Sequence, residues 1–445
     1  MDVKAWKAWG SQAIEHGVST VYGPPDEALM LSARQRGGLL ELMHMHFPRA
    51  IYEYRGEDFF VDYPPLSVLL LWAAAKAYRA FDPAAASGRL HTVVLNLLPL
   101  AASIPLALVL RRTAPGREGV WRALAFWCNP AILLAAVLGY QDAVFALAAL
   151  LGVLALQEER FVAATAWITA AGLLKPQASL LLPSFAALLL SQAGPRTWLK
   201  CALAGLAVAT LVLAPWWWTG HLLSALDGCR RPLSENTLSA QNLNLWWIAG
   251  WRAQWAKEGA WPVARILFSE EFRRLSGLDP QWPSRLLLLA GTVANIFLLL
   301  RIPATLPPRV PLSIIVQTHV YALFGTSVHE NHTYLAVMLA ALMLFAWPPA
   351  PRVLAATSAF LFANLFLFEG VGRGLIRDRV LLRFRMLAGL DLTVVVAVLH
   401  VALVVWLFVL LARAARAGRV SERRDPLPGP STPGSPGPPA SPAGP

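Results

Sequence analysis

Long apolar blocks alternate with short polar loops along most of the chain. Blocks such as residues 92–110 and 201–218 contain no charged residue, and about 18 apolar residues are enough to cross a bilayer as a helix. The two-residue alternation that is typical of an outer-membrane barrel strand is absent from these blocks. The pattern therefore predicts an all-α fold, a polytopic transmembrane helical bundle.

We expect about eleven membrane spans in the sequence. They cover residues 91–110, 121–138, 142–156, 161–174, 177–190, 198–217, 285–300, 311–328, 333–346, 353–367 and 390–411. An earlier block, residues 63–81, contains Lys76 and Arg79 within its apolar stretch. We interpret that block as a helix lying in the membrane interface on the outer side.

These spans divide the chain into five regions. Residues 1–90 form a first outer loop that contains the interfacial helix, and residues 91–218 form a transmembrane module. A long outer loop at 219–284 precedes the C-terminal transmembrane helices at 285–412. Residues 413–445 are basic and then rich in proline, which is typical of a disordered segment. We expect this tail in the cytoplasm.

Composition and charge agree with a membrane protein. Hydrophobic residues make up 56% of the chain and charged residues 14%, against about 25% charged in an average soluble domain. The net charge of +12 arises largely from short basic loops such as residues 111–117, and an excess of Lys and Arg marks cytoplasmic loops. We therefore do not interpret the charge as a nucleic-acid-binding surface.

The orientation that follows puts the opening segment and residues 139–142, 219–284 and 325–332 on the outer face. One loop departs from this rule, because residues 370–385 carry five arginines, including Arg373 and Arg377, on the expected outer face.

High usage of Ala, Arg and Pro is typical of a GC-rich bacterial genome, so we expect a multi-pass protein of the inner (plasma) membrane.

Acidic residues gather in the segments that we place outside. Asp2 lies in the opening segment, Asp62 precedes Tyr63-Pro64-Pro65, and Asp142 follows Gly139-Tyr140-Gln141. Capping of the following helix is an alternative interpretation of Asp62 and of Asp142, because a carboxylate accepts hydrogen bonds from free backbone N–H groups at a helix start.

Basic and metal-binding residue types occur at two further breaks. Lys175 lies between two apolar blocks, where a lysine must either find a partner or snorkel to the interface. His329, Glu330 and His332 lie in the outer segment 325–332, and the spacing of the two histidines predicts that they share one helical face. We expect no metal, because three or four ligands are needed and no zinc-type cysteine spacing is present.

A third polar group lies in the long outer loop. It consists of Gln241, Asn242 and Asn244, followed by Trp246 and Trp247. The tryptophans are typical of a membrane-interface belt. The three amides beside them are of the kind that hydrogen-bond sugar hydroxyls.

Taken in order, these motifs resemble a GT-C glycosyltransferase of the polyprenyl-phosphate-sugar-dependent group, which includes the dolichyl-phosphate-glucose glucosyltransferases of N-glycan assembly. The matching pieces are Asp2 with Trp9, Gly17 and Tyr22; Asp62-Tyr63-Pro64-Pro65-Leu66; Asn129-Pro130; Gly139 with Asp142; and His329-Glu330. In that family a transmembrane helix precedes the first aspartate. We therefore expect that one helix is missing before Asp2.

The resemblance implies inverting transfer of a hexose or pentose from a polyprenyl-phosphate donor to a lipid-linked or cell-envelope glycan, without a metal or other cofactor. It implies Asp2 as the general base, with Asp62 as the second choice. His329, Lys175, Arg373 and Arg377 are candidates for stabilising the leaving phosphate. The further substrate-binding candidates are Asp142, Gln241, Asn242, Asn244, Trp246, Trp247 and Glu330.

Three alternatives remain open. A transporter or flippase of lipid-linked saccharides also has about a dozen spans, but it would place polar residues at mid-membrane. A membrane scaffold would not need an ordered set of outer carboxylates. A related enzyme with the same fold could act on a protein or polymer. The identities of the sugar and the acceptor cannot be read from these residues.

Overall fold

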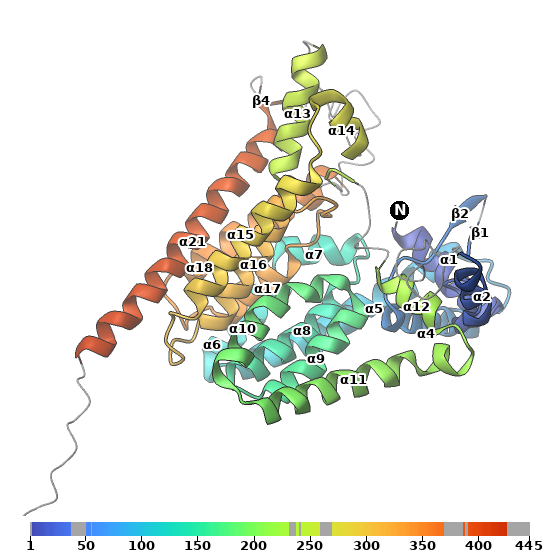
Figure 1. Ribbon diagram of the computed structural model, residues 1–445, viewed down its shortest axis with the longest axis horizontal. Coiled ribbons are helices and arrows are strands. Elements are labelled where there is room, and N and C mark those ends of the chain that lie inside the picture. The colour runs from blue at the N-terminus through green and yellow to red at the C-terminus, as the bar shows by residue number, and fades with distance from the viewer. Residues whose placement is uncertain are drawn as a thin grey trace, which may run out of the picture.

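The computed structural model consists mainly of helices (Figure 1). These helices pack around buried apolar side chains. It describes residues 2–36, 50–54, 56–230, 237–239, 242–258, 269–368, 386–387 and 390–424. The described strands form only two short antiparallel hairpins, β1 (Tyr52–Tyr54) with β2 (Glu57–Phe59) and β3 (Met386–Leu387) with β4 (Leu390–Asp391). The predicted all-α class is confirmed.

The first region folds into a small module at one side of the molecule (Figure 1). Its elements are α1 (Asp2–Glu15), η1 (Val18–Thr20), α2 (Asp26–Arg36), the β1–β2 hairpin and α4 (Pro65–Phe81). Helix α1 packs tightly on α4, because a Cβ atom added at Gly10 would lie 2.9 Å from the Cβ of Ala75. Trp6 and Tyr22 form the core of this module together with Trp216 from a later helix.

Helices lie at each of the eleven positions where a span was expected. They are α5 (Gly88–Arg112), α6 (Gly116–Trp127), α7 (Pro130–Val137), α8 (Asp142–Gln157), α9 (Phe161–Leu174), η2 (Pro176–Leu181), α10 (Leu182–Gln192), α11 (Pro195–Trp218), α15 (Gln281–Leu299), α16 (Arg309–Phe324), α17 (Tyr334–Leu342), α18 (Ala350–Phe368) and α21 (Leu392–Arg424). Here α6 with α7, and η2 with α10, each share one expected span.

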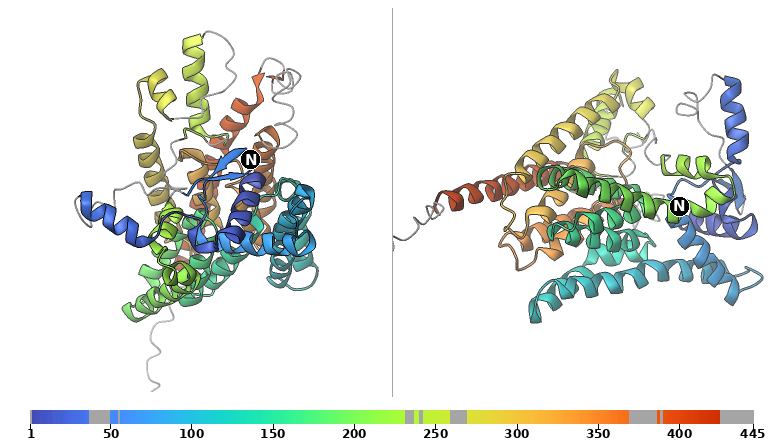
Figure 2. Two further views of the ribbon diagram at one scale, coloured as in Figure 1. Left: turned by 90° about the vertical axis from the view of Figure 1, so that its right-hand side faces the viewer. Right: turned by 60° about the horizontal axis from the view of Figure 1, so that its bottom comes forward.

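Five of the described helices are long and apolar enough to cross a membrane: α5, α11, α15, α18 and α21. The bent pair α6–α7 gives a sixth candidate, and α8 and α9 are shorter apolar helices of 16 and 14 residues. The structure therefore supports a helical membrane protein with five or six spans by length and composition. Figure 2 shows that α21 reaches well beyond the other helices.

The bend between α6 and α7 has a clear origin in the sequence. Pro130 lacks a backbone N–H and cannot continue α6, so α7 is bent by 46° relative to α6. Asn129 is the N-cap of α7 and accepts a hydrogen bond from the N–H of Ala131 at 3.0 Å. Residues 121–138, which were expected as one straight span, are therefore two helices.

Burial distinguishes the centre of the bundle from its outside. Every residue of α17 is buried, as are most residues of α16. Helix α11 instead exposes large apolar side chains such as Leu206 and Leu211, which are 63% and 77% exposed. A helix that exposes so much apolar surface is suited to contact with lipid.

Three more described helices lie between α11 and α15 in the sequence. They are α12 (Leu222–Arg230), α13 (Leu245–Glu258) and α14 (Ser269–Ser276). Helix α12 is tied to the N-terminal module, since Asp26 accepts hydrogen bonds from the backbone N–H groups of Leu222 and Leu223 at 3.0 and 2.9 Å. This contact holds the module against the end of α11. The module also meets two breaks between bundle helices that carry polar residues, one at η2 and one at residues 325–332.

Candidate functional site

A cavity of about 300 Å³ lies where the N-terminal module meets those two breaks. The module contributes α1 and the segment around residues 58–63. The bundle contributes η2 and the turn at 325–332 between α16 and α17. Acidic and basic side chains therefore meet in one space. The Asp, Glu, Lys, Arg and His residues of its lining are Asp58, Asp62, Lys175, His329 and His332.

The carboxylates lie on the wall that the N-terminal module provides. Asp58 is in β2, and Asp62 lies between that strand and α4. The backbone here is held in place because the Trp9 indole N–H donates to the carbonyl oxygen of Phe60 at 3.0 Å. Helix α1, which carries Trp9, thus positions the segment that carries both carboxylates.

Asp62 does not cap α4. The N-cap of that helix is Pro64, and it receives no side-chain cap. Tyr22 donates a hydrogen bond to the carbonyl oxygen of Tyr63 at 2.6 Å, which fixes the turn between Asp62 and the helix. The capping interpretation of Asp62 is wrong, because the rigid Pro-Pro start already sets the helix geometry.

Asp2, the first-choice base, is the first residue of α1. Its side chain lies outside the described part of the structure. Three other residues of the same helix, Ala5, Trp6 and Trp9, line the cavity. The helix that carries Asp2 therefore forms part of the cavity wall.

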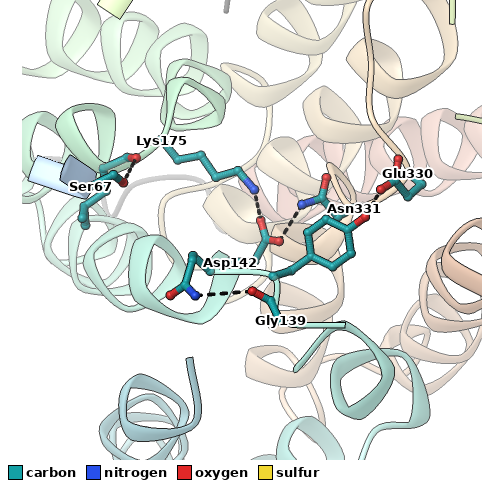
Figure 3. Close-up of polar contacts among 9 residues, drawn as sticks. Ser67, Gly139, Asp142, Lys175, Glu330 and Asn331 are labelled. Carbon is teal, nitrogen blue, oxygen red and sulfur yellow. Dashed lines mark hydrogen bonds and ion pairs between the residues drawn. The ribbon is translucent and has the colours of Figure 1, made fainter. Parts of the chain in front are cut away.

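A buried ion pair lies on the opposite wall (Figure 3). The Lys175 Nζ atom is 2.6 Å from Asp142 Oδ1, and the Asn331 amide donates to Asp142 Oδ2 at 2.7 Å. The side chains of Lys175 and Asp142 are only 5% and 1% exposed. Lys175 is therefore paired and does not snorkel, which resolves the two alternatives for it.

Asp142 supports the wall but does not line the cavity. It is the first residue of α8, whose N-cap is Gln141, and no side chain caps that helix. The capping interpretation of Asp142 is wrong, because both of its oxygens are used by Lys175 and Asn331.

The turn at 325–332 is fixed at both ends. Tyr140 donates a hydrogen bond to Glu330, which is buried (Figure 3). Ser327 exchanges hydrogen bonds with Thr237 at 3.1–3.2 Å, and it has a left-handed φ of 58°. Glu330, predicted to bind substrate, instead lies behind the wall and holds the turn that presents His329.

The two histidines do not share a helical face as predicted. Helix α16 ends at Phe324 and α17 starts at Tyr334, so the segment between them is a turn. The prediction fails because the two histidines are joined by a turn and not by a helix, and in this turn the His332 N–H donates to the carbonyl oxygen of His329 at 3.2 Å. The rings of His329 and His332 nevertheless lie 5.3 Å apart, and both residues line the cavity.

The surroundings of His332 keep its imidazole neutral. The ring is stacked on Tyr321 with centroids 5.7 Å apart, and the residue is 8% exposed. Burial is the main cause of a pKa far below its usual range, and the charges of His329 and Lys175 lower this pKa further. Over the described chain, no three His, Cys, Asp or Glu side chains are grouped as a metal site would require.

The amides and tryptophans of the outer loop are not brought to this cavity. Asn242 and Asn244 donate to the carbonyl oxygens of Ala322 and Gly325 at 2.6 and 3.1 Å. The indole N–H groups of Trp246 and Trp247 donate to Phe324 O and Thr393 Oγ1. All four residues are buried. Since protein partners already occupy their polar groups, they fasten the loop to α16 and α21.

Three other predicted residues, Gln241, Arg373 and Arg377, lie outside the described residues. The cavity also contains polar residues that the sequence did not single out as binding groups. Gln177 and Ser179 come from η2, and Asn331 comes from the 325–332 turn. Their only signal in the sequence was position, because each lies within a few residues of Lys175 or His329. His332, which the sequence offered only as a possible metal ligand, also lines the cavity.

No protein-family model matches the chain, and a search of curated proteins found no match either. The family resemblance therefore rests on the motif residues themselves, and several of these are now placed around one cavity.

Proposed function

We propose that this protein is an integral-membrane inverting glycosyltransferase of the GT-C type. It transfers a hexose or pentose from a polyprenyl-phosphate donor to a lipid-linked or cell-envelope glycan on the outer face of the inner membrane. In this proposal all eleven helical segments cross the bilayer, and α4 lies in the interface. The observation that carries the proposal is the single cavity with carboxylates on one wall and basic groups on the other.

The carboxylate wall provides the general base. A cavity carboxylate accepts the proton of the acceptor hydroxyl while the oxygen of that hydroxyl forms a bond to the anomeric carbon of the donor sugar. The bond between that carbon and the phosphate oxygen breaks on the opposite face, so the configuration inverts and polyprenyl phosphate leaves. Asp62 is the carboxylate that the described cavity supports best in this role. Asp2 stays a prediction from the resemblance.

The opposite wall stabilises the leaving phosphate. His329 is exposed to the cavity and provides a hydrogen-bond donor for a phosphate oxygen. Lys175 is held in place by Asp142, so its ammonium group is preorganised and needs no rearrangement when negative charge develops. Because these side chains can stabilise a monophosphate leaving group, the proposed transfer does not require a metal ion.

The transporter alternative is less well supported by the positions of the polar groups. Polar side chains within α15 and α16 bond to one another, as in the pairs Asn295–Ser313 and Gln317–Thr292 at 3.0 and 2.9 Å. Such mutually satisfied groups fasten the helices together. The charged residues instead surround a cavity formed by helix ends and loops.

The proposal is tested by turnover of defined donors. The full chain is purified in detergent and mixed with undecaprenyl-phosphate and decaprenyl-phosphate sugars and a membrane glycolipid extract. We expect release of polyprenyl phosphate coupled to the appearance of the sugar on an acceptor with inverted anomeric configuration. Asp279→Asn serves as a control, because Asp279 is exposed and its carboxylate accepts a hydrogen bond from the backbone N–H of Gln281 in its own turn, the one hydrogen bond of this side chain among the described residues. Absence of turnover with every donor would overturn the proposal.

A further inference from the structure

The cavity has an aromatic side and a polar side. Aromatic side chains of the N-terminal module cover one side: Trp6, Trp9, Phe59, Phe60 and Tyr63. The rings of Trp9 and Tyr63 lie 5.5 Å apart at 44°, which leaves an uneven apolar surface. The polar side is formed by η2 and the 325–332 turn. A monosaccharide has the same two-sided character, because its ring presents C–H groups on a face and hydroxyl groups around the edge.

Gln177 on the polar side has hydrogen-bonding capacity that the described protein does not use. The residue is 9% exposed, and its Oε1 atom is buried without a hydrogen-bond partner among the described residues. It follows Lys175 by two positions, in the 3-10 helix that Pro176 begins. A buried amide oxygen without a partner is unfavourable, so such a group normally indicates a water molecule or a ligand.

His332 shows the same property on the neighbouring segment. It is 8% exposed, and its Nδ1 atom is buried without a hydrogen-bond partner among the described residues. The neutral imidazole has one donor and one acceptor nitrogen. The ring cannot easily turn away from the cavity, since it is stacked on Tyr321 and its backbone follows Asn331, which is bonded to Asp142.

We propose that Gln177 and His332 bind hydroxyl groups of the donor sugar and thereby select which sugar is transferred. The sugar lies with its C–H face toward the aromatic side, between Asp62 and the basic groups. A cavity of about 300 Å³ is at the small end of ligand sites, which suits one sugar unit and not an oligosaccharide. This inference rests on the proposed glycosyltransferase function.

The test compares donors that differ only in the configuration of one hydroxyl. The probes are polyprenyl-phosphate-linked glucose, mannose and galactose, and kcat and KM are measured for the full chain in detergent. We expect wild type to prefer one of them. Gln177→Leu and His332→Phe should each lower kcat/KM for that donor about tenfold, the effect of one lost hydrogen bond, while the other donors change less. The ratio of kcat/KM between the preferred donor and the other donors should therefore fall in both variants.

Gln12→Leu is the matched control. Gln12 is also a buried glutamine, at 7% exposed, with an unpartnered Oε1 among the described residues, but it does not line the cavity. This variant should keep the donor preference of wild type. Gln177→Asn retains the amide group and should retain more of the preference than Gln177→Leu, which separates loss of a hydrogen bond from loss of structure.

The outcomes distinguish the two proposals. If wild type turns over a donor and both cavity variants keep its preference, the assignment of Gln177 and His332 is overturned while the glycosyltransferase proposal stands. If wild type turns over no donor, the glycosyltransferase proposal itself fails. If one cavity variant does not purify as a monodisperse protein, the other is judged by the same preference criterion.

Discussion

Two buried polar networks differ in charge. One holds the 325–332 turn through Asn331, and the other holds the end of α16 through Asn242. The network of Asp142, Lys175 and Asn331 contains an ion pair and forms the back of the cavity. The network of Asn242 and Asn364 includes amides, the Ser239 hydroxyl and backbone groups, with no ion pair among the described residues, and these residues do not line the cavity. Neutral amides are sufficient to fasten a loop. A buried ion pair is more costly to maintain, and here it lies beside the cavity in which the proposed transfer would develop negative charge.

The largest effect is expected from breaking the ion pair. Asp142→Asn leaves Lys175 as a buried cation without a carboxylate, and removal of one partner of such a pair costs about 3–5 kcal/mol in stability. The midpoint of thermal unfolding in detergent should fall strongly. Adding Lys175→Met should recover most of this loss, because the double variant contains no uncompensated charge. Equal destabilisation of the single and double variants would contradict the role assigned to the pair.

A smaller effect is expected from the neutral network. Asn364 accepts from the backbone N–H of Leu243 at 3.1 Å and donates to Asn242 at 2.7 Å. Asn364→Ala leaves the Leu243 N–H and the Asn242 Oδ1 without these partners. Each loss costs about 1–3 kcal/mol in stability, and local movement relieves part of this cost. Thermal unfolding should shift less than for Asp142→Asn, and the KM for donor should stay unchanged. A raised KM with unchanged stability would show that this network takes part in the site.

The smallest effect is expected from pH. The pKa of His332 is lower in the folded protein than in the unfolded chain, so the unfolded chain takes up the proton first. The contribution of His332 to the free energy of unfolding is complete above pH about 6.5. It decreases as the pH falls below this value, by at most about 1.4 kcal/mol for each pH unit. His332→Phe should remove that part of the pH slope in thermal unfolding. An identical slope in both proteins would rule out the residue as its source.

The helices were largely predictable from the chain, because apolar blocks of suitable length have few other stable forms in a membrane. The break at Pro130 was underestimated. The partner of Lys175 could not be predicted, since Asp142 lies 33 residues away and many carboxylates were available. Without knowledge of the packing, the amides around Asn242 could not be told apart from ligand groups.

Cavity residues such as Gln177 and Ser179 were missed for a related reason. Neutral polar residues beside apolar blocks are common, and only the fold shows which of them face a shared space. The motif residues Asp62, Lys175 and His329 were identified beforehand because charge is rare in these segments and therefore conspicuous. Their meeting in one cavity is a property of tertiary packing.

The most direct measurement of the central claim is the single-turnover rate of sugar transfer by Asp62→Asn beside Asp58→Asn and Asp2→Asn. The substitution removes the base while preserving shape, and loss of a general base lowers the rate about 10²- to 10⁴-fold. We expect this loss for Asp62→Asn, with unchanged thermal unfolding, and a much smaller loss of rate for Asp58→Asn. A wild-type rate in Asp62→Asn together with a lost rate in Asp2→Asn would move the base to α1. Full activity in all three variants would contradict the account.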